Sequence, residues 1–229
     1  LDLSHNLFNG TIADGVGHWE DLRLLYMNQN FFTGSLPASI FSPAHKSQLE
    51  IIDLGGNWLS GMIPNEIGDL SNLVRLALYE NWISGTIPPF IANCKKLDTL
   101  YLDSNDLSGT IPRMLVTELI KLQDLRLRSN HLKGHIPEGI GDNLQQLKLL
   151  YLDDNELAGS IPSSIGLMSR LEELHLYKNK LTGTLPEELG KLRYLSLLYI
   201  DSNSLTGSIP DSFGDLHSLQ QLFMFQNKL

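Results

Sequence analysis

The stretch LYLDSNDLSGTIP, residues 100–112, decides the fold of this protein, because the chain repeats it with small changes from end to end. Residues 150–162 read LYLDDNELAGSIP, and residues 174–186 read LHLYKNKLTGTLP. Aligned on its asparagine, the phrase recurs at intervals of 24, 27, 24, 24, 25, 25, 24, 24 and 24 residues. The aligned asparagines are Asn6, Asn30, Asn57, Asn81, Asn105, Asn130, Asn155, Asn179, Asn203 and Asn227. A fixed period of this length is typical of a solenoid, in which each repeat packs only against its neighbours.

The repeating unit is L-x-x-L-x-L-x-x-N-x-x-x-G-x-I-P, followed by a variable stretch with its own apolar positions. Leucines that alternate with polar residues before the asparagine predict a short, half-buried strand. The asparagine can donate to and accept from backbone groups where the strand ends, so stacked copies predict an asparagine ladder. The glycine permits a turn that a side chain would obstruct, and the proline ends regular strand pairing. Apolar residues ten positions after each asparagine, from Val16 to Phe213, are expected to anchor the outer wall.

Over its whole length the chain resembles the leucine-rich repeat proteins, specifically the plant-type subclass with the G-x-I-P signature. The phrases quoted above are similar to repeats of plant receptor-kinase ectodomains and polygalacturonase-inhibiting proteins. The resemblance implies an α/β repeat solenoid of horseshoe or superhelical shape. It places a parallel β-sheet on the concave face and short helical, 3-10 or irregular segments on the convex face.

We expect a single leucine-rich repeat domain over residues 1–229, with nine to ten repeats of 24–27 residues. Members of this family close both ends of the array with polar or cysteine-paired caps, which cover the core leucines of the terminal repeats. This chain opens on a strand pattern, LDLSHN, and stops inside a repeat, QNKL. We therefore interpret it as a fragment whose terminal caps are missing.

Composition and motifs argue against several classes of function. A formal net charge of −9 without a basic stripe argues against nucleic-acid binding. No apolar run is long enough to cross a bilayer, so we expect no membrane contact within this segment. The chain has no phosphate-binding loop, dinucleotide, nucleophile-elbow or zinc-protease motif, so we predict no enzyme and no cofactor. His131 and His135 are expected in a turn without a third ligand, so no metal site is predicted.

Two single residues carry further expectations. Cys94 occupies the position that Leu70, Met168 and Leu192 fill in other repeats, so we expect it to be buried and inert. Asn9 begins Asn-Gly-Thr, the only N-x-S/T sequon of the chain, and would be glycosylated in a secreted eukaryotic protein.

Binding is expected on the strand residues that face away from the core. In a stacked parallel sheet, the residues four and two positions before each asparagine recur at about 4.8 Å. From the fifth repeat onward the first of these two columns is aromatic or cationic throughout. Tyrosine and arginine are enriched at binding hot spots because they combine a wide contact area with a polar end. The candidate ligand-binding residues are Tyr101, Asp103, Arg126, Arg128, Tyr151, Asp153, His175, Tyr177, Tyr199 and Asp201.

Two other interpretations of these columns are a purely structural role and catalysis by a pair of carboxylates. Aromatic neighbours on adjacent strands stabilise each other by about 0.2–1 kcal/mol per pair without any ligand. Asp103 and Asp153 lie two strands apart, at a spacing of about 9.6 Å that an inverting glycosidase would just accept. We expect an exposed, solvated face to leave both carboxyl pKa values unshifted, which argues against an enzyme.

Arg126 and Arg128, in LQDLRLRSN (122–130), stand where other repeats carry tyrosine and aspartate. Arg126 is expected between two tyrosines, and Arg128 between Asp103 and Asp153. In several plant peptide-hormone receptor kinases that the chain resembles, an R-x-R pair at these positions captures the C-terminal carboxylate of the peptide. Arg126 and Arg128 match that pattern, and a self-satisfied cross-strand cluster is the alternative.

We therefore predict non-catalytic recognition of a peptide or protein on the concave face. The sequence leaves a co-receptor and the oligomeric state open. The resemblance implies the ectodomain of a receptor-like protein or kinase, located outside the cell or at its surface. The alternatives are a secreted inhibitor or defence protein that blocks an enzyme by the same surface, and a purely structural array.

Overall fold

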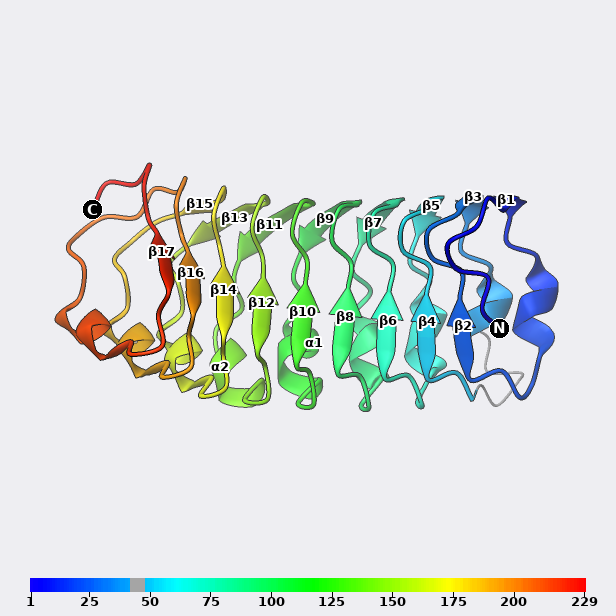
Figure 1. Cartoon of the computed structure of the whole chain (residues 1–229), viewed down its shortest axis with the longest axis horizontal. Coiled ribbons are helices and arrows are strands. Elements are labelled where there is room, and N and C mark those ends of the chain that lie inside the picture. The colour runs from blue at the N-terminus through cyan, green and yellow to red at the C-terminus, as the bar shows by residue number, and fades with distance from the viewer. Residues whose placement is uncertain (42–47) are drawn as a thin grey trace.

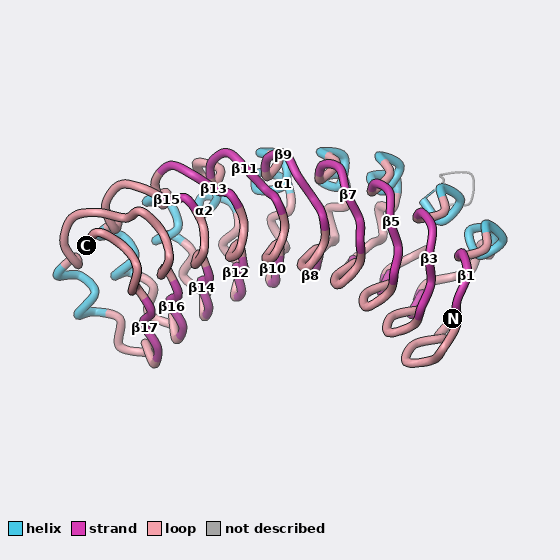
Figure 2. The backbone as a smooth tube through the Cα atoms, turned by 90° about the horizontal axis from the view of Figure 1, so that it is seen from above, coloured by secondary structure: helices cyan, strands magenta, loops and turns pink. Residues whose placement is uncertain are grey.

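The computed structural model describes residues 1–41 and 48–229 and shows a single solenoid (Figure 1). Successive coils lie side by side along the long axis, with the two termini at opposite ends. Seen from above, the coils form an arc with the helical segments on its outer rim (Figure 2). The predicted solenoid of the leucine-rich repeat type, with strands inside and short helices outside, is confirmed.

A parallel sheet lines the concave face, with one three-residue strand from each repeat after the first. In the described chain its order is β17-β16-β14-β12-β10-β8-β6-β4-β2. The strands are β2 (Leu24–Tyr26), β4 (Ile51–Asp53), β6 (Arg75–Ala77), β8 (Thr99–Tyr101), β10 (Asp124–Arg126), β12 (Leu149–Tyr151), β14 (Glu173–His175), β16 (Leu197–Tyr199) and β17 (Gln221–Phe223). The central residue of most of these strands is fully buried, as Leu100 and Leu125 are, and the last residue faces the concave side.

A second parallel sheet follows the asparagine on the flank of the solenoid. Its strands are β1 (Asn9–Thr11), β3 (Phe31–Ser35), β5 (Trp58–Met62), β7 (Trp82–Thr86), β9 (Asp106–Thr110), β11 (His131–His135), β13 (Glu156–Gly159) and β15 (Lys180–Leu181). The sequence predicted only a turn here, so the placement of His131 and His135 in a turn was wrong: both lie on β11. From β3 onward the second residue of each strand is buried, as Leu107 is, which gives the segment the alternation of a half-buried strand.

Short helices form the convex wall. They are η1 (Asp14–His18), η2 (Ala38–Phe41), η3 (Asn65–Asp69), η4 (Pro89–Asn93), α1 (Arg113–Glu118), α2 (Ile140–Asn143), η5 (Ser163–Leu167), η6 (Glu187–Lys191) and η7 (Asp211–Asp215). The expected apolar anchors lie in these helices, and those from Ile40 to Leu189 are buried. Adjacent helices pack closely: a Cβ on Gly166 would lie 2.3 Å from the Glu188 carbonyl oxygen.

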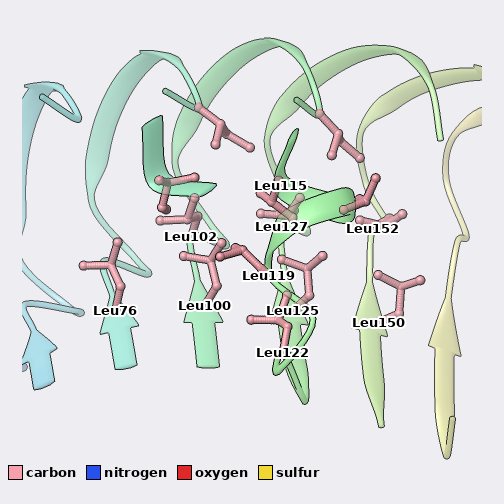
Figure 3. Close-up of a cluster of buried hydrophobic side chains, with 14 of the residues drawn as sticks. Leu76, Leu100, Leu102, Leu115, Leu119, Leu122, Leu125, Leu127, Leu150 and Leu152 are labelled. Atoms are coloured by element: carbon pink, nitrogen blue, oxygen red, sulfur yellow. The ribbon is translucent and has the colours of Figure 1, made fainter. Parts of the chain in front are cut away.

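The core lies between the concave sheet and the convex helices. Figure 3 shows strand leucines Leu100, Leu125 and Leu150 in one layer with Leu115 and Leu119 of the α1 region. All five side chains are fully buried. Because each repeat adds the same layer, one continuous core runs the length of the array.

Cys94 belongs to this core and is fully buried, as predicted. Its Sγ donates to the Ile67 carbonyl oxygen at 3.2 Å. Burial raises the pKa of the thiol to about 12, so the thiolate needed for reactivity does not form near neutral pH.

The predicted asparagine ladder is confirmed. Asn130 Nδ2 donates to the carbonyl oxygens of Leu102 at 3.0 Å and of Leu127 and Arg128 at 3.1 Å. Its Oδ1 accepts from the Leu107 N–H at 3.0 Å. Each asparagine from Asn30 onward thereby joins its own strand end to the preceding repeat, and the same pattern continues to Asn227.

Candidate functional site

The last residues of six neighbouring concave strands form one stack. It comprises Tyr101, Arg126, Tyr151, His175, Tyr199 and Phe223, and we call it the ring stack; the strand register places each member beside the next. The Arg126 guanidinium carbon lies 4.4 Å from the centre of the Tyr101 ring and 5.1 Å from that of Tyr151. Tyr151 and His175 stack at 4.1 Å, His175 and Tyr199 at 4.5 Å, and Tyr199 and Phe223 at 4.7 Å between ring centres. The predicted position of Arg126 between two tyrosines is confirmed.

Acceptors on the following strand hold the phenol groups of the stack. The Tyr101 hydroxyl donates to Asp124 Oδ2 at 2.5 Å, and the Tyr151 hydroxyl donates to Glu173. The Tyr199 hydroxyl donates to Gln221 in the same way. Burial, reinforced by the hydrogen bond to Asp124, raises the pKa of Tyr101 to about 12. The stack is therefore a fixed wall of rings.

These acceptors were missed in the sequence. Asp124, Glu173 and Gln221 stand six positions before their asparagines, at the first residue of a concave strand. The predicted binding residues came from the columns four and two positions before the asparagine. A reading of the column six positions before it would have found a polar partner one strand beyond each of these tyrosines.

The two arginines differ in how far their charges are neutralised. Arg126 makes a bidentate ion pair with Asp124 on its own strand, with Nη2–Oδ2 at 2.8 Å and Nε–Oδ1 at 3.0 Å. Arg128 Nε lies 3.5 Å from Asp103 Oδ2. The side chain of Arg128 is 41% exposed and that of Arg126 is 29% exposed. Arg128 is therefore the more accessible cation.

The carboxylates of the second column are buried, which contradicts the expectation of a solvated face. Asp103 is 5% exposed, Asp153 is 0% exposed and Asp201 is 6% exposed. Burial is the largest cause of a pKa above the usual range at Asp103 and of a rise to about 6 at Asp153. Longer side chains from adjacent strands lie beside two of these residues: Arg128 is next to Asp103, and Tyr177 is next to Asp153. The argument against an enzyme from unshifted carboxyl pKa values therefore fails.

Asp153 is the least satisfied of these groups. Neither of its carboxylate oxygens has a hydrogen-bond partner within the described part of the chain. Tyr177 and Arg128 are the neighbours that favour its charged form, but they offset only part of the desolvation. Burial also raises the pKa of Tyr177 to about 12.

His175 is neutral in the stack. It is 9% exposed, and burial lowers its pKa to about 4. Its Nε2 has no hydrogen-bond partner among the described residues and lies 3.6 Å from Glu173 Oε2. At neutral pH it therefore contributes an aromatic ring rather than a positive charge.

Residues 1–41 and 48–229 contain neither a metal-binding cluster nor a membrane-spanning helix. No group of three or more His, Cys, Asp and Glu side chains in these ranges is arranged to hold a metal ion. His131 lies 3.0 Å from Asp106, and both side chains are largely exposed. No helix in the same ranges combines the length and apolarity needed to cross a bilayer.

The fold is that of a leucine-rich repeat solenoid. It combines parallel coils with a leucine core and an asparagine ladder, and its concave face carries a column of rings. A family model described as "Leucine rich repeat" matches residues 169–229, and a model described as "Leucine Rich Repeat" matches residues 48–70, 72–94, 96–117, 121–143 and 146–168. The chain belongs to the leucine-rich repeat family.

Its relatives include plant receptors. Phytosulfokine receptor 1 of Arabidopsis thaliana is 40% identical over 67 residues, which are 29% of this chain and 6% of that receptor. The crystal structure of PEPR1 with AtPEP1 is 39% identical, with a TM-score of 0.93, over 99% of this chain and 31% of that chain. The Arabidopsis receptor kinase HAESA, solved with the peptide hormone IDA and the co-receptor SERK1, is 33% identical, with a TM-score of 0.93, over 99% of this chain and 37% of that chain. This chain thus spans about a third or less of each of these receptors.

Proposed function

We propose that this protein recognises an extended peptide on its concave face, without catalysis, as part of the ectodomain of a receptor-like protein at the cell surface. The observation that carries the proposal is the ring stack with the partly exposed Arg128 beside it. The similarity to receptor ectodomains solved with peptides supports it.

The ring stack suits binding because it is ordered before a ligand arrives. Stacking fixes the rings, and hydrogen bonds to Asp124 and Glu173 fix two of the phenols. A side chain that is free in solution loses about 0.5–1.5 kcal/mol when an interface immobilises it. A wall that is already rigid avoids most of that loss, so contact area translates more fully into affinity.

The dimensions of the stack fit a short peptide. From β8 to β16 there are four strand spacings, about 19 Å at the usual separation. An extended chain of about six residues spans that length. Such a peptide would run across the strands and contact the partly exposed rings of Tyr101 and Tyr199, with the largely buried Tyr151 between them.

The geometry refines the carboxylate hypothesis for the arginine pair. The Nε and Nη2 groups of Arg126 are committed to Asp124, so this residue serves as part of the wall. Arg128 has one longer ion pair and a more exposed side chain, so it would accept the terminal carboxylate of the peptide. Its buried neighbours Asp103 and Asp153 limit the net positive charge around Arg128, so a ligand carboxylate must be well oriented to bind there.

Binding to two matched peptide libraries tests the proposal. Random hexapeptides with a free C-terminus and the same peptides with an amidated C-terminus are panned against the secreted protein, and the best binders are measured by calorimetry. We expect Arg128→Ala to weaken binding of free-carboxylate peptides about tenfold, which is about 1.4 kcal/mol. Amidation should cost the wild type a similar factor and the variant almost nothing.

Arg170→Ala is the matched control, because Arg170 is an exposed arginine outside the concave columns. It should leave binding unchanged. If neither library binds, or if Arg128→Ala and Arg170→Ala behave alike, the stack stabilises the sheet and has no role in peptide recognition.

A further inference from the structure

The residues directly after the ladder asparagines change in character along the chain. In the first four repeats they are apolar, namely Leu7, Phe31, Trp58 and Trp82. In the next four they are charged or imidazole, and they pair along the flank. His131 lies 3.0 Å from Asp106, and Lys180 lies 2.7 Å from Glu156. Only the first half presents an apolar surface to solvent.

Phe31, Trp58 and Trp82 form what we call the aromatic platform. Phe31 is 37% exposed, Trp58 is 54% exposed and Trp82 is 71% exposed. The Phe31 and Trp58 ring centres lie 5.1 Å apart. Exposed rings gathered on three neighbouring strands mark a surface that is covered in the working molecule.

A groove of about 510 Å³ runs beside the platform. Gln29, Glu80 and Ser104 also line it and offer an amide, a carboxylate and a hydroxyl group. None of the described residues that line it is a lysine or arginine. The groove therefore combines flat apolar rings with hydrogen-bonding groups and has no complement for an anion.

The only sequon of the chain lies at the edge of this platform. Asn9 is exposed on β1, and the strand register pairs it with Phe31 on β3. The next step of the register pairs Thr33 with Trp58. Side chains of paired residues on parallel strands point to the same face, and so do those two residues apart on one strand, so a group attached to Asn9 emerges beside Phe31 on the face that also carries Trp58.

We propose that Asn9 carries an N-linked oligosaccharide whose inner sugars lie on the aromatic platform. The transfer joins Asn9 Nδ2 to the anomeric carbon of the first sugar. It breaks the bond from that carbon to the pyrophosphate of a lipid-linked oligosaccharide donor and releases the lipid pyrophosphate and one amide proton. The inference uses the secretory route contained in the proposed function but does not depend on peptide binding.

The chemistry of a neutral sugar matches the surface. The C–H face of a pyranose ring packs against the electron-rich face of an indole, and its hydroxyl groups bond to Gln29, Glu80 and Ser104. From β1 to β7 there are three strand spacings, about 14 Å, which a chain of about three sugar rings spans. The glycan would cover the apolar half of the flank, whereas the charged side chains of the other half pair with one another.

Site occupancy is the first test. The protein is secreted from a eukaryotic host, and the peptide that contains Asn9 is analysed by mass spectrometry. We expect a glycan on wild type and on Thr11→Ser, and none on Thr11→Ala. An unmodified Asn9 in the secreted wild type would overturn the proposal, whatever the peptide libraries show.

Contact with the platform is the second test. We expect peptide N-glycosidase to release the native glycan about threefold to tenfold faster from Trp58→Ser/Trp82→Ser than from wild type, because the packed sugars must detach first. The matched control is Asn9→Gln/Thr182→Asn, which moves the sequon to the equivalent exposed position of a repeat flanked by Lys180 and Ser204. Its glycan should be released at the fast rate. Equal rates for wild type, platform variant and control would overturn the platform contact.

Acrylamide quenching of tryptophan fluorescence provides a readout that leaves the platform intact. In a Trp19→Phe background only the two platform indoles emit, since the chain has three tryptophans. We expect the glycosylated protein to be quenched at most about half as efficiently as its enzymatically deglycosylated form, because the sugars shield the indoles. Identical quenching of the two forms would show that the glycan extends into solvent.

Discussion

Replacing Asn130 with alanine should destabilise the array through one specific backbone group. The Asn130 side chain makes four hydrogen bonds, but the three carbonyl acceptors each keep another donor. Asn105 Nδ2 bonds to the Leu102 oxygen, Asn155 Nδ2 to the Leu127 oxygen and the Ser104 N–H to the Arg128 oxygen. The buried Leu107 N–H alone loses its acceptor, Asn130 Oδ1. An unsatisfied buried amide costs about 1–3 kcal/mol, so we expect the free energy of unfolding to fall by that amount.

The assay is urea unfolding followed by far-ultraviolet circular dichroism, with Asn6→Ala as the control. Asn6 occupies the same ladder position in the first repeat and donates to Leu3 and Ser4, but it is exposed and accepts from no N–H of the described chain. Its replacement should cost less than about 0.5 kcal/mol, as for an ordinary surface change. Equal losses for the two variants would refute the reasoning, since the acceptor role distinguishes them.

Two further outcomes follow from buried groups and from backbone geometry. Burial raises the folded-state pKa of Asp153 to about 6 from 3.8, so its stabilising contribution is full below pH 4 and is lost as the pH rises through 6. Asp153→Asn should therefore raise the free energy of unfolding by about 1–3 kcal/mol at pH 7.5 and change it little at pH 4, as measured by chemical unfolding at both pH values. Gly109 has φ +78° and its added Cβ would lie 2.8 Å from Thr86 Cγ2, whereas Gly10 has φ +83° and open space. In thermal melts we expect Gly109→Ala to cost about 2 kcal/mol or more and Gly10→Ala about 1 kcal/mol, and a reversed order would contradict the proposed close contact.

The repeating framework could be predicted because it depends on local geometry that every repeat shares. The strand leucines, the ladder asparagines and the convex anchors each occupy one position in a fixed period, so ten copies specify them together. The flank sheet was missed because a glycine and a proline close together indicate a turn when each repeat is considered alone. Its strands pair only with the same segment of adjacent repeats, as β9 pairs with β7 and β11, and this is a property of the stack.

The site could be predicted only in part, for a related reason. The order of Tyr101, Arg126 and Tyr151 follows directly from the strand register, and the ring stack has that order. The burial of Asp153 does not follow from the register, because it depends on which side chains of adjacent strands lie across a short carboxylate. Exposure cannot be read from strand alternation alone where large and small residues occupy the same column.

The concave ring stack and the exposed aromatic residues of the flank lie in different halves of the solenoid. The concave strands carry the ring stack from β8 onward, and the flank carries exposed aromatic residues only up to β7. Because the leucine core and the ladder are the same in every repeat, stability does not require this division. Ring stacking accounts for aromatic residues on the concave strands, but it does not account for Trp82, which makes no ring contact with the described residues. The flank aromatic residues therefore support our proposal of a separate bound group, with the sequon one strand away from Phe31 as its proposed attachment point.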